Sequence, residues 1–160
     1  MRPLVQRIYV KHCPHDMYSL PVRDLIDQSK LVLAPPDMSV CEAARHMAMR
    51  GTGAVLIMAD GRLVGIVTES DIVVRVVARN GDPRTTTLAH VMTGAPKTVD
   101  AGKSFGYAML VMHENGFRHL PVVEGDVPIG LVSARNALDP DLEEFVSESR
   151  RREQIRREND

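Results

Sequence analysis

Gly65-Ile66-Val67-Thr68-Glu69-Ser70-Asp71 returns 65 residues later as Gly130-Leu131-Val132-Ser133-Ala134-Arg135-Asn136. Both stretches run from a glycine through aliphatic residues to a hydroxyl residue, which Asp or Asn follows three positions later. The same offset aligns residues 54–58 with 119–123, and Ser39 with Ser104. A repeat at a fixed offset indicates two copies of one structural unit.

Each unit predicts the element order strand, helix, strand, strand, helix. The first helix of each unit is expected to begin after Ser39 and after Ser104. A serine hydroxyl at that position can accept hydrogen bonds from the free backbone N–H groups of the first turn. Gly51 and Gly116 follow these helices, and glycine readily adopts the left-handed conformation that ends a helix. The two helices are therefore expected at equivalent places.

The remaining elements follow from short apolar runs separated by turn residues. We expect a leading strand, a hairpin and a second helix in each unit. Their ranges are 31–34, 55–58, 63–67 and 70–79 in the first unit, and 97–100, 120–123, 129–132 and a short helix near Asn136 in the second.

The chain divides into five predicted segments. They are an N-terminal arm (1–19), a first repeat (20–79), a polar linker (80–87), a second repeat (88–138) and a charged C-terminal helix (139–160). In the last segment Glu148 and Glu153 each precede an arginine by four residues, the spacing of helical ion pairs. We therefore interpret its arginines as a solvated helix face rather than a nucleic-acid contact.

Composition restricts the class of protein. The 160 residues are 44% hydrophobic and 26% charged with a net charge of −1, so nothing calls for a nucleic-acid partner. No apolar run reaches the length of about 18 residues that a membrane span needs, and the first residues do not resemble an export signal. His12, Cys13 and His15 crowd together without the four spaced ligands of a structural zinc site. We expect a cytoplasmic protein without metal or membrane contact.

Three motifs together resemble the CBS domain family, and a CBS pair (Bateman module) in particular. They are residues 65–71, residues 118–123, and residues 91–93 with 96–99, and the resemblance covers about Pro21 to Leu138. It implies an α/β (α+β) fold in which two tandem repeats pack sheet to sheet about a pseudo-two-fold axis. It also implies two clefts between the repeats that bind adenosine-containing ligands.

Asp71 is the first candidate site residue. A ribose presents two neighbouring hydroxyl donors, and an ionised carboxylate has two oxygens to accept them. Thr68, three residues earlier, can add a hydroxyl near the ribose or phosphate. The same Thr-x-x-Asp spacing is also a helix capping box, a purely structural alternative. The two roles are compatible, and the resemblance favours the ribose role for Asp71.

The resemblance implies one principal cleft with cations at its phosphate end. Arg118 offers a planar fork to phosphate oxygens and His119 can add a proton near neutral pH, although a solvated Arg and a packed His are the alternative. Arg135 is as easily a surface residue. The full predicted set is Thr68, Asp71, Lys97, Thr98, Val99, Arg118, His119, Pro121 and Arg135.

The second cleft is expected to be weaker. Asn136 stands where the first repeat has Asp71, and an amide has one acceptor oxygen and no charge. Gly53 and Ala54 replace the basic pair Arg118–His119. Changing Asn136 to Asp is expected to restore only the acceptor. The predicted set is Leu33, Gly53, Ala54, Ser133 and Asn136.

These residues favour a regulatory sensor rather than an enzyme. We expect it to bind AMP, ATP or NAD, to require no further cofactor, and to shift conformation or assembly for a regulated protein that the sequence does not name. A homodimer is expected, with contacts from Met47, Met49, Met109 and Met112. The alternatives are a scaffold with vestigial clefts and a nucleotide hydrolase, although no catalytic motif is evident.

Overall fold

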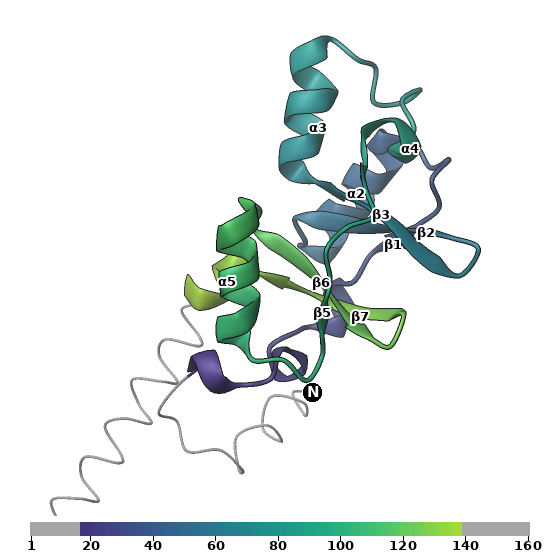
Figure 1. Cartoon of the computed structure of the whole chain (residues 1–160). Helices are drawn as coiled ribbons and strands as arrows, with labels where there is room; N and C mark the ends of the chain where they lie inside the picture. The colour runs from purple at the N-terminus through teal and green to yellow at the C-terminus, as the bar shows by residue number, and fades with distance from the viewer. Residues whose placement is uncertain (1–16, 139–160) are drawn as a thin grey trace, which may run out of the picture.

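The computed structural model describes residues 17–138, and Figure 1 shows two stacked halves of mixed α+β structure, as predicted. The first sheet has the strand order β1 (Leu33–Ala34), β2 (Ala54–Ala59), β3 (Arg62–Thr68), β4 (Thr93–Gly94). The second sheet has the order β5 (Val99–Asp100), β6 (His119–Glu124), β7 (Val127–Ser133).

Four α-helices accompany these strands within the described residues. They are α2 (Val40–Arg50), α3 (Glu69–Arg75), α4 (Leu88–Val91) and α5 (Phe105–Asn115). Five short 3₁₀ segments complete the structure: η1 (Met17–Ser19), η2 (Val22–Asp24), η3 (Gln28–Lys30), η4 (Val77–Arg79) and η5 (Ala134–Leu138). The N-terminal residues 1–16 and the C-terminal segment 139–160 lie outside the described residues.

The predicted helix caps are confirmed. The Ser39 hydroxyl accepts a hydrogen bond from an N–H in the first turn of α2, and the Ser104 hydroxyl does the same for α5, both at 3.2 Å. Gly51 and Gly116 follow the two helices with φ of 61° and 70°, which is the left-handed region. These local signals set equal helix lengths in the two repeats.

The two hairpins repeat each other residue by residue. β2 pairs with β3 from Ala54↔Thr68 onward, and β6 pairs with β7 from His119↔Ser133 onward. Each hairpin shifts register at the equivalent point, so both carry the same bulge. The 65-residue offset therefore holds at the level of strand register.

The second helix of the first repeat is shorter than predicted. The sequence predicts a helix over 70–79, but α3 ends at Arg75, and Val76 has φ −116° and ψ −67°. Val76 is completely buried in the core of the first repeat, and its carbonyl accepts a hydrogen bond from the Gly81 N–H. Packing of this valine takes precedence over helix continuation, which β-branched residues support only weakly.

The segment that leads into each repeat packs on the core of the other repeat. Val22 is buried among the second-repeat residues around Phe105. Leu88 and Val91 of α4 are buried among the first-repeat residues around Val40. Backbone hydrogen bonds fix both arrangements, from the Phe105 N–H to the Leu20 carbonyl and from the Val40 N–H to the Thr86 carbonyl. Each core is therefore built from both parts of the sequence.

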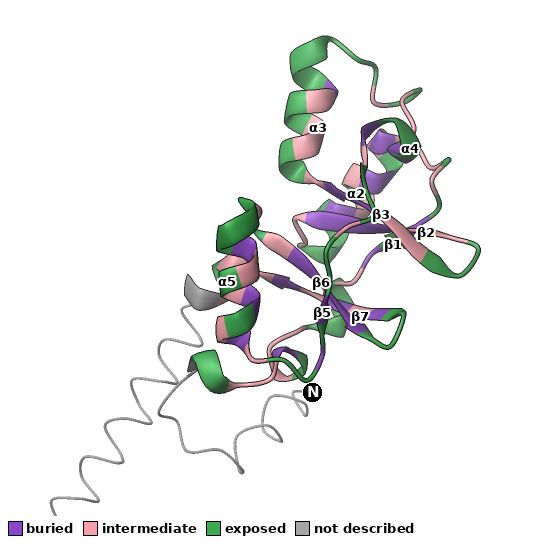
Figure 2. Cartoon of the chain, viewed as in Figure 1, coloured by how far each residue is buried: buried purple, intermediate pink, exposed green. Residues whose placement is uncertain are grey.

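The sheets meet through a small apolar layer. Ala54, Leu56 and Ile66 are buried between them, and Leu131 of β7 packs against this cluster. Figure 2 shows the buried residues concentrated in these strands and on the inner faces of α2 and α5. Within residues 17–138 no helix is long and apolar enough to cross a membrane.

Candidate functional site

A cleft of about 330 Å³ lies where the two repeats meet. Its walls come from the end of β3, the start of α3 and β4 on the side of the first sheet, and from residues 96–97, the start of β6 and η5 on the other side. The lining residues are Ile66, Thr68, Glu69, Ser70, Asp71, Thr93, Pro96, Lys97, Gly116, Phe117, Arg118, His119, Pro121, Ser133 and Arg135.

The carboxylate of Asp71 is held by a complete capping box. Its Oδ2 accepts hydrogen bonds from the backbone N–H and the hydroxyl of Thr68, both at 2.9 Å. The Thr68 hydroxyl in turn accepts from the Asp71 N–H at 3.2 Å. The Asp71 side chain is 16% exposed, so a carboxylate with a fixed orientation remains accessible to the cleft that it lines.

Three cations line the same cleft. Lys97, Arg118 and Arg135 are exposed and come from three separate segments of the second repeat. Glu69 and Asp71 are the carboxylates of the lining. A phosphorylated ligand with a ribose suits such a division, because phosphate prefers guanidinium and ammonium groups and hydroxyls prefer carboxylate.

His119 of the second repeat lies against Gly53 of the first. A Cβ added at Gly53 would lie 2.7 Å from the His119 Nε2 and 3.4 Å from the Glu69 Oε2. Burial lowers the pKa of His119 below its ordinary value of 6.5. The carboxylates of Glu69 and Asp71 oppose this shift, whereas Arg135 and Arg118 add to it. The free protein therefore holds a neutral imidazole near neutral pH.

Two residues of the predicted principal set do not line the cleft. Val99 is 2% exposed, pairs with Val122 and packs in the core of the second repeat, so its side chain is structural. Thr98 is exposed but is not among the lining residues. Sequence alone does not reveal which side chain of a short strand faces inward. The other seven lie together around one cavity: Thr68, Asp71, Lys97, Arg118, His119, Pro121 and Arg135.

The five residues predicted for the second cleft are distributed over different environments. Ser133 lines the principal cleft, and Gly53 lies against His119. Ala54 is buried between the sheets, whereas Leu33 is 47% exposed. Asn136 accepts from the Ser133 N–H at 2.7 Å through Oδ1 and donates to the Leu25 carbonyl at 3.5 Å through Nδ2. Both ends of its amide therefore have partners within the fold.

Several lining residues were not predicted from the sequence. Glu69 and Ser70 lie between the predicted Thr68 and Asp71, so the capping-box motif itself could have indicated them. Thr93 and Pro96 belong to the third motif of the family resemblance, residues 91–93 with 96–99. Gly116 and Phe117 carry no chemical signal, because they contribute through their position at the end of α5.

Comparison with known proteins identifies the repeats. The family model for the CBS domain matches residues 22–78 and 88–141. The meiotically up-regulated gene 70 protein of Schizosaccharomyces pombe is 36% identical over 127 residues, which are 78% of this chain and 17% of that protein. CBS domain-containing protein CBSCBSPB3 of Arabidopsis thaliana is 34% identical over 64% of this chain and 18% of its own length. The chain thus spans less than a fifth of these curated relatives.

Solved structures agree with the fold. The CBS-domain containing protein ATU1752 from Agrobacterium tumefaciens is 29% identical, with a TM-score of 0.65 over 74% of this chain and 97% of that one. The CBS domain pair of protein MJ0100, solved with 5′-methylthioadenosine and S-adenosyl-L-methionine, has a TM-score of 0.66 at 23% identity over 74% of this chain and 93% of that one. With both repeats matched by the family model, this chain belongs to the CBS domain family and is a CBS pair, a regulatory module.

Proposed function

We propose that this CBS pair is a sensor that binds an adenine nucleotide, such as AMP, ATP or NAD, in the cleft lined by Asp71 and Arg118. The observation that carries the proposal is the convergence of a fixed carboxylate with three cations around one cavity. The carboxylate would accept the ribose hydroxyls, and Lys97, Arg118 and Arg135 would receive the phosphate.

The protein MJ0100 supports the adenosine part of this proposal by analogy of fold, since its CBS pair was solved with two adenosine-containing molecules. The adenine base would lie against apolar and backbone groups of the cleft, such as Ile66 and Pro121. The second cleft would contribute little, because Asn136 has partners within the fold and no carboxylate replaces it.

Binding would act by shifting an equilibrium of conformation or assembly, which requires different affinity for two states. We propose a homodimer as the assembly. The expected methionine contacts are wrong for Met47 and Met112, which are 4% and 2% exposed and belong to the cores. Exposed apolar residues suited to the contact are Val73, Val74 and Val77 on α3 and η4, and Leu110 on α5. In Figure 1, α3 and α5 both lie on the left side of the molecule.

Calorimetry with AMP and GMP tests the proposed ligand. We expect micromolar binding of AMP and at least about tenfold weaker binding of GMP, a difference near 1.4 kcal/mol. Equal affinity for the two nucleotides, or no binding of either AMP or ATP, would remove the proposal. A phosphate-release assay with ATP separates the sensor from the hydrolase alternative, since a sensor produces no turnover.

A further inference from the structure

Arg75 does not line the cleft, but it contacts two residues that do. Its Nη2 lies 3.3 Å from the Asp71 Oδ1 and donates a hydrogen bond to the Thr93 hydroxyl at 3.2 Å. Its Nη1 donates to the Val91 carbonyl at 2.6 Å. Asp71 and Thr93 are lining residues from α3 and β4, and because β4 pairs with β3, both belong to the first-sheet side of the cleft. One guanidinium therefore ties the start of α3 to β4 along one side of the cleft.

The acceptor positions of the Asp71 carboxylate are nearly all in use. Four lone-pair positions are available on a carboxylate. Two on Oδ2 are taken by the N–H and hydroxyl of Thr68, and one on Oδ1 faces Arg75. The position that remains for a ligand hydroxyl is thus on Oδ1, the oxygen whose place Arg75 sets. Release of the Thr68 hydroxyl would provide the second position on Oδ2.

The second repeat explains why Arg75 is needed. There Asn136 accepts from the Ser133 N–H and donates to the Leu25 carbonyl, so one amide closes the turn and ties it to the preceding segment. Asp71 performs the first task but has no proton to donate to the Val91 carbonyl, the corresponding acceptor. Arg75 supplies that donor and neutralises the carboxylate at the same time.

We propose that Arg75 is the positioning residue for ribose recognition, holding the Asp71 Oδ1 in a fixed place against the Thr93 segment on the same side of the cleft. The proposal rests on the proposed adenine-nucleotide function. It predicts an effect on ribose selectivity rather than on affinity alone. Loss of a positive charge near the cleft weakens every phosphorylated ligand alike, whereas misplacement of Oδ1 acts only on the hydroxyl that it accepts.

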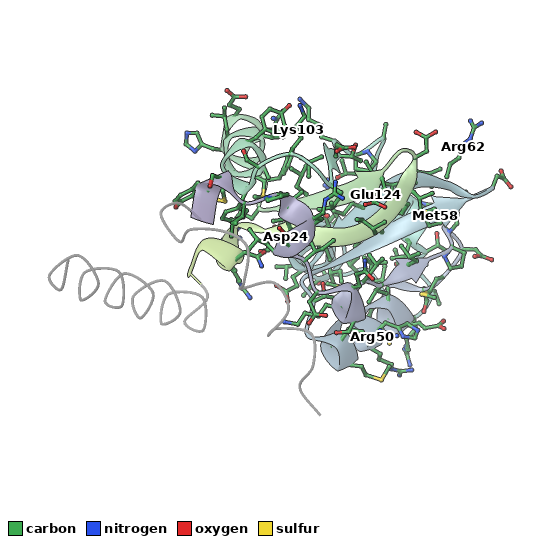
Figure 3. The ribbon with its side chains drawn as sticks, turned by 90° about the horizontal axis from the view of Figure 1, so that it is seen from below. Asp24, Arg50, Met58, Arg62, Lys103 and Glu124 are labelled. Atoms are coloured by element: carbon green, nitrogen blue, oxygen red, sulfur yellow. The ribbon has the colours of Figure 1, made fainter. Side chains whose placement is uncertain are left out.

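The test compares AMP with 2′-deoxy-AMP by calorimetry in the full chain and in Arg75→Met. We expect the unchanged protein to prefer AMP by at least about tenfold, the value of one hydrogen bond to a charged acceptor. Arg75→Met is expected to reduce this preference to less than about threefold. Arg62→Met is the control, because Arg62 is exposed at the start of β3 and Figure 3 shows its side chain extending away from the body.

The outcomes separate the two proposals. If the unchanged protein binds neither nucleotide, the proposed function fails and this inference fails with it. If it binds AMP selectively and Arg75→Met keeps the tenfold preference, the inference alone is wrong, even if both affinities fall equally. Should circular dichroism show that Arg75→Met does not fold, Arg75→Lys replaces it. One ammonium cannot reach all three acceptors, so the preference must fall there too; an unchanged preference overturns the inference.

Discussion

Gly53 of the first repeat lies directly against the imidazole of His119 of the second. A Cβ at position 53 would approach the His119 Nε2 to 2.7 Å, closer than carbon and nitrogen atoms pack. In the repeat alignment Gly53 is equivalent to Arg118 of the second repeat. The absence of a side chain at position 53 makes room for the imidazole ring of His119. The sequence suggests a cation lost from the second cleft, whereas the structure gives Gly53 a packing role beside the first.

Gly53→Ala is therefore expected to displace the imidazole. The added methyl group must push the His119 ring, at a cost to stability of about 1 kcal/mol. Urea unfolding measures that cost, and an NMR titration of His119 reports the changed surroundings of its ring. Gly94→Ala is the matched control, because the nearest atom to its Cβ would be 4.0 Å away. Equal stability of the two variants and an unmoved His119 titration would contradict the packing role.

Asp71 combines a cap with the proposed ribose contact, and two substitutions separate these tasks. Asp71→Ala is expected to weaken AMP binding by about 2–3 kcal/mol and to lower the free energy of unfolding by about 1 kcal/mol. Asp71→Asn keeps an oxygen for the Thr68 N–H, so it should lose affinity with less effect on stability. Calorimetry and urea unfolding give the two quantities. Asp82→Asn, in the exposed linker, serves as control, and unchanged AMP affinity in Asp71→Ala would refute the ribose role.

His119 makes stability depend on pH in a defined direction. Because burial lowers its pKa in the folded protein, the unfolded chain binds more protons between that lowered value and about 6.5. The contribution to stability is complete above about pH 6.5 and decreases as the pH falls through this window. Glu69 and Asp71 limit the effect, and Arg118 and Arg135 increase it. Urea unfolding from pH 7.5 to 5 in the unchanged protein and in His119→Gln isolates this contribution, which must shrink in the variant.

Asn136→Asp is expected to destabilise the chain rather than to create a second site. A carboxylate can still accept from the Ser133 N–H, but its other oxygen would face the Leu25 carbonyl without a donor. We expect a loss of about 1–2 kcal/mol in the free energy of unfolding and AMP affinity unchanged at the principal cleft. If calorimetry shows a second equivalent of bound AMP and urea unfolding shows no loss of stability, this prediction is wrong. The result would then support the sequence-based expectation that Asp at position 136 restores the acceptor of the second cleft.

Charged residues introduced at the expected contact surface test the proposed homodimer. Val74 and Val77 are 54% and 61% exposed, and changing both to Glu places unpaired charge on an apolar surface. Light scattering should then give the 17.7 kDa of a single chain, in contrast to twice that mass for the unchanged protein. Val127→Glu, at the exposed start of β7, is the control. A single-chain mass for the unchanged protein at high concentration would exclude the dimer.

The sequence predicts features that depend on local patterns and on the repeat. Ser39 and Gly51 bound α2 as expected, and the offset places both hairpins in register. Features that depend on tertiary packing are missed. The end of α3 follows from burial of Val76, and the inward side of β5 follows from burial of Val99. The i,i+4 spacing of Asp71 and Arg75 can be read from the sequence, but the other two partners of Arg75 cannot, since they lie 16 and 18 residues away on α4 and β4.

The exchange of leading segments makes each repeat depend on the other for a complete core. The core around Phe105 includes Val22, and the core around Val40 includes Leu88, so a single repeat with its own leading segment lacks part of its core. Two identical copies could close each other by exchanging these segments. A single repeat with its own leading segment would therefore expose part of its core unless a second copy covered it.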